Sequence, residues 1–336
     1  MRSRDIVRKA WQMTQVHLKK LIWYGAVPAF FSTVVSSVYL AYQYNAFKTS
    51  PLFSDTAEHS DVFGTAKTIW GLLSGYPTVS IVLLVVGILL FVGYTVIPPI
   101  FRGILINAVM RIKNYKPIEG STEIGVRRFF PMFEFALLTG SFGITTIFTE
   151  SSFILRWWGE NIFFVALPVL LFVVMVGLII SFLFTYAEYY IVLEDKPLIR
   201  SVMDSTILVI SNLRKTFLIF ILMLLISVRV ILNVLLVLLI PMMVVILTSY
   251  FATVFWHVVG FVLIGIFGLG VLCVSSYLFG LFNVFATAVW VLTFSILVNK
   301  GKPVIEDVDL GQDTFKGAIQ PDPVAVQETP PSSETS

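Results

Sequence analysis

The stretch SVMDSTILVISNLRKTF, residues 201–217, lies between two apolar runs and resembles neither of them. Its polar and apolar residues recur at helical spacing, with Thr206, Leu208 and Arg214 as exceptions, so the pattern predicts a two-faced helix. Basic residues gather at its end, next to an apolar run that begins at Phe217. A helix of this kind lies in the headgroup plane of a bilayer with its apolar face toward the acyl chains. The stretch therefore indicates a membrane protein.

The composition supports the same interpretation. Hydrophobic residues make up 57% of the 336 residues, charged residues make up 13%, and the mean hydropathy is +0.90. Water-soluble domains carry about 25% charged residues. Several apolar runs are also longer than the roughly 18 residues that indicate a membrane span. We therefore predict an all-α fold, a polytopic membrane helical bundle.

We expect an integral membrane domain over residues 1–300 with six transmembrane helices, which cover about 21–42, 79–97, 133–153, 162–184, 217–247 and 256–298. Pro98 and Pro99 are expected to end the second span, and Gly159 and Glu160 are expected to form the tight turn between the third and fourth spans. The last apolar region is too long for one span and too short for two, so we expect a break near Gly280. Residues 301–336 are acidic and rich in Pro, Ser and Thr, which predicts a disordered cytoplasmic tail.

The lysine and arginine residues predict the orientation of the chain. With six crossings, only Lys48, Lys67 and Arg156 lie on the outer side, and Arg229 lies inside the fifth span. The other basic residues fall on the side of the N-terminus. Because cytoplasmic loops carry the excess of basic residues, we expect a multi-pass protein of the inner (cytoplasmic) membrane with both termini in the cytoplasm. An odd number of crossings would move the tail lysines outward and weaken this asymmetry.

The two-faced pattern occurs more than once. Residues 5–24 align with residues 200–219 without a gap, and a looser third copy covers residues 120–140. The sequence therefore predicts three units, each an interfacial helix followed by a two-span hairpin. Their approximate ranges are 1–97, 98–190 and 191–300. The alternative is that basic residues precede any span entered from the cytoplasm, which alone would produce part of the match.

Two connecting segments also resemble a known family: FRGILINAVMRIKNYKPIEGSTEIGVRRFFPMFE (101–134) and YYIVLEDKPLIRSVMDSTILVISNLRKTFLIF (189–220). They are similar to bacterial six-span membrane domains that resemble the membrane domain of glycerophosphodiester phosphodiesterases. In that family two helices separated by a polar turn lead into the third span, and an extended IVLED-type exit from the fourth span precedes an amphipathic helix. The resemblance implies the six-span fold. It does not imply phosphodiesterase activity, which in that family belongs to a separate soluble domain that we do not expect here.

The sequence contains no recognisable catalytic or metal-binding motif. Its three histidines, His17, His59 and His257, are far apart and not at metal-ligand spacing. The glycines of GIFGLG (265–270) follow no strand, so they fit close helix packing better than a phosphate cradle. The only cysteine, Cys273, excludes a disulfide within the chain. We expect no enzymatic activity, no cofactor, no metal and no nucleic-acid partner.

Two groups of residues are candidates for function. The intramembrane candidates are Arg229, Asn233 and Glu150. A charge in mid-span costs about 2.5–3.5 kcal/mol, so Arg229 should face the bundle interior, a water-filled cavity or Asn233, or mark an interface if the fifth span breaks there. The candidate contacts to lipid headgroups are the basic pairs of the three interfacial helices: Lys19, Lys20, Arg127, Arg128, Arg214 and Lys215.

Two functions from different classes fit these residues. The first is a non-enzymatic membrane protein that organises membrane lipids or a partner membrane protein through its basic interfacial helices. The alternative is a transporter or flippase-like protein with a cavity that involves Arg229. Against this alternative, the units share one orientation rather than the inverted one common in transporters, and few polar residues line the spans. An enzyme that acts on lipid ranks third, because no residue pattern supports it.

Overall fold

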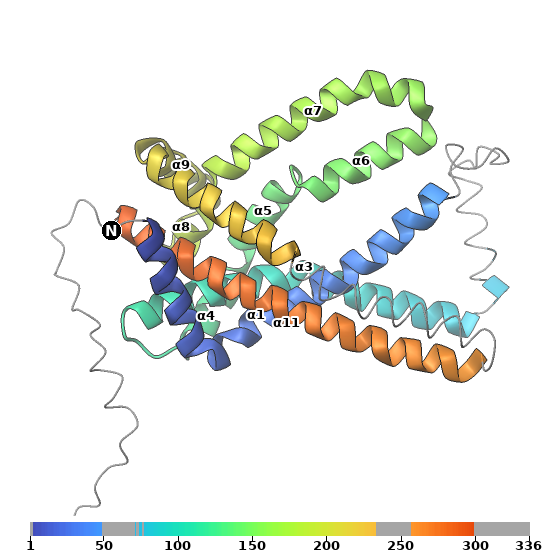
Figure 1. Ribbon diagram of the computed structural model, residues 1–336, viewed down its shortest axis with the longest axis horizontal. Helices are drawn as coiled ribbons and strands as arrows, with labels where there is room; N and C mark the ends of the chain where they lie inside the picture. Colours follow the sequence, from blue (N-terminus) through green and yellow to red (C-terminus); the bar gives the residue numbers. More distant parts are fainter. Residues whose placement is uncertain (1–2, 49–70, 72–73, 76, 233–256, 299–336) are drawn as a thin grey trace, which may run out of the picture. The chain divides into compact units, whose positions relative to one another are not determined.

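The computed structural model describes residues 3–48, 71, 74–75, 77–232 and 257–298. Over these residues the chain is helical and forms no strand, which confirms the predicted all-α fold class (Figure 1). The labelled helices are α1 (Ser3–Lys48), α3 (Pro77–Lys113), α4 (Ser121–Arg127), α5 (Phe129–Gly140), α6 (Ile144–Trp157), α7 (Gly159–Leu183), α8 (Ala187–Leu193), α9 (Leu198–Ser211) and α11 (His257–Val298). A further helix, Leu213–Leu232, follows α9.

Five of the described helical stretches are long and apolar enough to cross a membrane: Arg4–Leu40, Ser80–Lys113, Asn161–Leu193, Leu213–Leu232 and Ile266–Val298. In the first four, at most 17% of the most apolar 18-residue window is buried within the protein, against 61% in the last. Exposed apolar surface of this extent marks contact with lipid. The chain is therefore a multi-pass membrane protein.

The C-terminal half of α11 lies in the best-packed part of the protein. Its buried side chains, among them Val289 and Phe294, face α1, the second half of α3 and the short helix α8. The ring of Phe294 stacks on that of Tyr189, with ring centres 5.8 Å apart, and meets the ring of Tyr190 edge-on at 4.9 Å. This aromatic packing fixes α8 against α11.

The helices α1 and α11 cross where two glycines meet. A Cβ atom added to Gly25 would overlap the carbonyl oxygen of Gly280, and a Cβ atom added to Gly280 would lie 2.6 Å from the Cα atom of Ala26. Small residues allow helix backbones in membranes to approach this closely. The expected break near Gly280 is therefore wrong, because α11 continues through this residue, which instead serves the packing of the two helices.

The expected end of the second span at Pro98 and Pro99 is also wrong. The helix α3 continues through both prolines to Lys113. Proline removes a backbone hydrogen bond and crowds the preceding turn, but membrane helices tolerate it where neighbouring structure compensates. The turns that follow the prolines are buried at residues such as Ile106 and Val109. This packing keeps the segment helical.

The expected third span, 133–153, is not one helix. Helix α5 ends at Gly140, and α6 begins at Ile144. At the break the hydroxyl of Thr146 donates a hydrogen bond to the carbonyl oxygen of Gly140, at 2.8 Å. The single span is therefore replaced by two shorter helices.

The helices α6 and α7 form an antiparallel hairpin, seen at the upper right of Figure 1. The chain reverses at Gly159, whose φ of +82° favours glycine. The predicted turn between the third and fourth spans is confirmed at this position. Helix α7 covers nearly all of the expected fourth span, 162–184.

The exit from α7 is helical rather than extended. After a turn at residues 184–186, helix α8 includes Ile191, Val192 and Leu193, and φ is +61° at Asp195 beyond its end. The extended exit implied by the family resemblance is therefore wrong for this chain. The second half of the expected fifth span, Asn233 and the tail over 301–336 lie outside the described residues.

Candidate functional site

The buried face of α9 carries small polar side chains. Ser201, Ser205 and Val209 are each fully buried. The backbone N–H of Tyr186 donates to the Ser205 hydroxyl at 3.0 Å, and this hydroxyl donates to the carbonyl oxygen of Leu183 at 2.7 Å. Ser205 thus satisfies two backbone groups where α7 gives way to α8. The serines of the polar face therefore pack on the protein.

The outward face of α9 carries large apolar side chains. Ile199, Met203, Ile207 and Ile210 are each between 59% and 76% exposed. They recur at helical spacing and form one row, and the exposed Ser211 lies beside this row, about 100° around the helix from Ile210. A row of this kind suits a helix that lies along the membrane boundary with its apolar side toward lipid.

Residues that align in the predicted repeat are buried at the same positions of the copies. The aligned pairs of buried residues are Ile6 and Ser201, Ala10 and Ser205, Thr14 and Val209, and Leu21 and Thr216. The third copy has the same spacing of buried residues at Ser121, Gly125 and Met132. The chain turns at Arg128 and at Asn212, which occupy the same place in their copies. Basic residues that precede a span would not by themselves produce this shared pattern.

The first copy differs from α9 on its outward face. The positions that align with Ile199, Met203, Ile207 and Ile210 carry the exposed residues Arg4, Arg8, Gln12 and Gln15. This part of α1 therefore presents cations and amides where α9 presents hydrocarbon. The expectation of a similar two-faced helix in each unit is wrong for α1.

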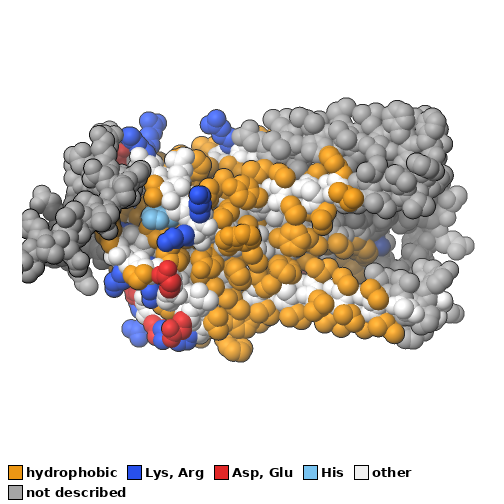
Figure 2. Space-filling view, turned by 90° about the horizontal axis from the view of Figure 1, so that it is seen from below, with side chains coloured by type: hydrophobic (Ala, Val, Ile, Leu, Met, Phe, Trp, Pro, Cys, Tyr) orange, Lys and Arg blue, Asp and Glu red, His pale blue; other side chains and the backbone are white. Residues whose placement is uncertain are grey.

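Five of the six predicted headgroup contacts are exposed, namely Lys19, Lys20, Arg127, Arg214 and Lys215. The sixth, Arg128, is only 17% exposed and forms an ion pair with Asp195 in the α8–α9 connection. Arg128, which lies between α4 and α5, therefore links this turn to the connection between α8 and α9. Figure 2 shows most charged side chains of this face at one end of the described structure and apolar side chains over the rest.

Lys196 holds the start of α9 in place. Its ammonium group lies 2.7 Å from the Glu194 carboxylate, 2.8 Å from that of Asp204, and 4.5 Å from the centre of the Tyr190 ring. Burial acts to lower the pKa of Lys196, but hydrogen bonds and attraction from Asp204 and Glu194 outweigh it and raise this pKa. Sequence reasoning used Lys196 only as a marker of orientation.

A second polar cluster joins three helices. Arg102 of α3 donates to both carboxylate oxygens of Glu188 of α8, at 3.0 and 2.6 Å, and to the hydroxyl of Thr287 of α11, at 2.9 Å. Sequence reasoning missed this cluster, because it placed Arg102 in a connection after the two prolines. A single carboxylate at Glu188 within an otherwise apolar stretch was the signal that could have indicated it.

The structure describes two of the three intramembrane candidates, Arg229 and Glu150. Arg229 lies near the end of the helix Leu213–Leu232 with an exposed side chain, and Glu150 is exposed on α6. Asn233 lies outside the described residues. Within the part of the chain that the structure describes, no group of three or more His, Cys, Asp and Glu side chains is placed to hold a metal ion.

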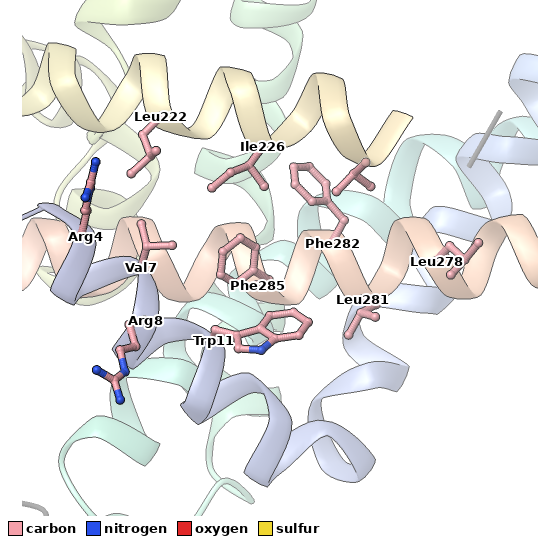
Figure 3. A pocket seen from close by; sticks show the side chains of 11 residues that line it. Arg4, Val7, Arg8, Trp11, Leu222, Ile226, Leu278, Leu281, Phe282 and Phe285 are labelled. Carbon is pink, nitrogen blue, oxygen red and sulfur yellow. The ribbon is translucent and has the colours of Figure 1, made fainter. Parts of the chain in front are cut away.

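A groove of about 660 Å³ lies between the first turns of α1, the helix Leu213–Leu232 and α11 (Figure 3). Its volume is within the range of roughly 300–1,000 Å³ that is usual for ligand sites. Arg4 and Arg8 line one end, and Leu278 of α11 lies at the other. Trp11 packs edge-on against Phe285, with ring centres 5.5 Å apart. Arg229 does not line this groove.

Comparisons with protein-family models, curated proteins and solved structures give no match for this chain. The resemblance to the membrane domain of glycerophosphodiester phosphodiesterases therefore stays a prediction.

Proposed function

We propose that this chain is a non-enzymatic protein of the cytoplasmic membrane that gathers anionic lipid through basic residues beside its interfacial helices. The observation that carries the proposal is α9, whose outward apolar row is followed at once by the exposed Arg214 and Lys215. An apolar row partitions into the headgroup region, and neighbouring cations attract anionic headgroups. In this proposal both termini lie in the cytoplasm, where the basic residues concentrate.

The exposed lysines of α1 support the same role. Lys19 and Lys20 align with Arg214 and Lys215, and all four are exposed. Each basic residue near an anionic surface contributes about 1 kcal/mol of attraction. This attraction decays over roughly one Debye length from the surface. Four such residues would enrich anionic lipid around the protein without any deep binding site.

The test is the lipid composition around the protein. The full chain is reconstituted in vesicles of phosphatidylcholine and phosphatidylglycerol, extracted in polymer-bounded discs, and the ratio of the two lipids is measured. We expect phosphatidylglycerol to exceed its bulk share at low salt and to approach it at high salt. The combined substitution Lys19→Gln, Lys20→Gln, Arg214→Gln and Lys215→Gln should remove most of the excess. An unchanged excess in this variant would refute the proposal.

The groove does not include Arg229, the residue on which the transport alternative rests. Its neighbour Val230 does line the groove of Figure 3. The alternative of a transporter or flippase-like protein therefore stays a prediction from the sequence.

A further inference from the structure

We propose that the groove between α1, the helix Leu213–Leu232 and α11 binds one anionic phospholipid, with its phosphate at Arg4 and Arg8 and an acyl chain along α11. This inference rests on the proposed function and adds a defined binding site to it. The site is distinct from the exposed pairs Lys19-Lys20 and Arg214-Lys215, none of which lines the groove.

The lining of the groove separates charge from hydrocarbon. Arg4 and Arg8 lie at one end, where Figure 3 shows the Arg4 side chain pointing toward the helix of Leu222 and the Arg8 side chain pointing away from it, and Trp11 follows one turn along α1. The remaining lining side chains carry only hydrocarbon, as in Ile226 and Leu281. An amphiphile with an anionic head and an apolar chain matches both parts.

Arg4 and Arg8 occupy positions at which the aligned helix α9 carries apolar side chains. Arg4 and Arg8 align with Ile199 and Met203, which α9 presents to the membrane boundary. The groove beside α9 also differs in charge, because its lining includes the carboxylates of Glu134 and Asp204 as well as Arg200. Excess positive charge is therefore particular to the groove of α1.

Some cations of the described residues already hold carboxylates. Arg102, Arg128 and Lys196 each form an ion pair with an acidic side chain. Within the described residues no such pair involves Arg4 or Arg8. Two cations at the mouth of an apolar groove suit a phosphodiester, and basic pockets between membrane helices bind anionic headgroups in this way.

Among candidate ligands, an anionic phospholipid is the one that fills both the charged end and the apolar part of the groove. A free phosphate would leave the apolar part empty, and a neutral lipid would leave the two arginines without a counter-charge. Lipid tails are as apolar as the leucines that surround them, so contacts with an acyl chain discriminate little between lipids. The acyl chain therefore positions the lipid along the groove, and the headgroup provides the selectivity.

The experiment is a titration of the detergent-purified full chain with phosphatidylglycerol or phosphatidylcholine, followed by native mass spectrometry. We expect one tightly retained phosphatidylglycerol per protein and much weaker retention of phosphatidylcholine. Arg4→Gln or Arg8→Gln should each weaken binding about 5-fold, and both together about 30-fold. Ile226→Trp, which fills the groove and leaves both arginines in place, should also weaken retention.

Each variant has a matched control. Lys9→Gln removes one charge next to Arg8 but outside the groove, and Leu225→Trp adds an indole on the exposed side of the same helix as Ile226. Both controls should bind phosphatidylglycerol like the unsubstituted protein. Equal retention of the two lipids, or unchanged binding when both arginines are replaced, would overturn the groove proposal.

The two proposals fail in different ways. If the double arginine variant binds normally but the four-residue glutamine variant loses its lipid enrichment in discs, the groove is wrong and the proposed function stands. If the enrichment is unchanged while groove binding depends on Arg4 and Arg8, the proposed function is wrong and the groove stands.

Discussion

Arg102 of α3 and Glu188 of α8 form a two-point ion pair, with nitrogen–oxygen distances of 3.0 and 2.6 Å. The same guanidinium group reaches Thr287 of α11 at 2.9 Å, so one side chain joins three helices that are far apart in sequence. Paired charges of this kind are strongly coupled, because the removal of one partner leaves the other buried without compensation.

Glu188→Gln should therefore destabilise the protein. The expected loss is about 3 kcal/mol, at the low end for buried pairs, because 32% of the Arg102 side chain is exposed. Thermal unfolding in detergent, followed by tryptophan fluorescence, checks this. The double variant Arg102→Met, Glu188→Met should recover much of the loss. Equal melting temperatures for Glu188→Gln and the unsubstituted protein would contradict the assignment.

Gly280→Val should weaken the crossing of α1 and α11. A Cβ atom at this position would lie 2.6 Å from the Cα atom of Ala26, and overpacking of this kind costs roughly 1–3 kcal/mol. Gly268→Val is the control on the same helix, because an added Cβ atom there meets nothing within 4 Å. We expect a lower melting temperature for Gly280→Val alone. Equal effects of the two substitutions would show that the crossing is not built on Gly280.

Ser205→Ala should release α9 from the body of the protein. The substitution leaves the buried N–H of Tyr186 without the hydroxyl that accepts its hydrogen bond, at a cost of about 1–3 kcal/mol. The exposed Ser211 provides the control substitution Ser211→Ala, which should change stability by less than about 0.5 kcal/mol. Hydrogen exchange of α9 amides should rise for Ser205→Ala. Unchanged exchange in this variant would argue against the contact.

Adjacent arginines should have separate effects. Arg128→Gln removes the closer ion pair to Asp195 and should lower stability by up to about 1 kcal/mol. Arg127 lies 3.8 Å from the same carboxylate but is 61% exposed, so it should contribute mainly to lipid enrichment. Melting temperature and the phosphatidylglycerol ratio in discs, measured for both variants, separate the two roles. If Arg127→Gln lowered the melting temperature as much as Arg128→Gln, this division of roles would be wrong.

The sequence was sufficient for features that depend on periodicity. The all-α fold, the separate helix α9 and the turn at Gly159 all follow from local patterns of apolar residues and glycine. The gapless alignment of residues 5–24 with residues 200–219 also predicted which residues share an environment, as the burial of Ala10 and Ser205 shows. Such patterns are read within one helix and need no knowledge of its neighbours.

Features that depend on neighbouring helices were not predictable in the same way. Pro98 and Pro99 lie within a helix because the following turns are buried, and Gly280 packs on α1 instead of ending α11. The partner of Arg102 is separated from it by a complete hairpin of the chain. The sequence shows the charge but not the helix that will lie beside it.

The most direct test of the proposed interfacial position of α9 is the depth of two spin labels in a nanodisc. Cys273→Ser leaves a chain without cysteine, into which Ile210→Cys or Ser211→Cys introduces a single labelling site. We predict that the label at 210 is relaxed more by oxygen, which concentrates in the acyl region, and the label at 211 more by a water-soluble nickel complex. Equal relaxation of both labels by the nickel complex would place both positions in water and contradict the interfacial position of α9.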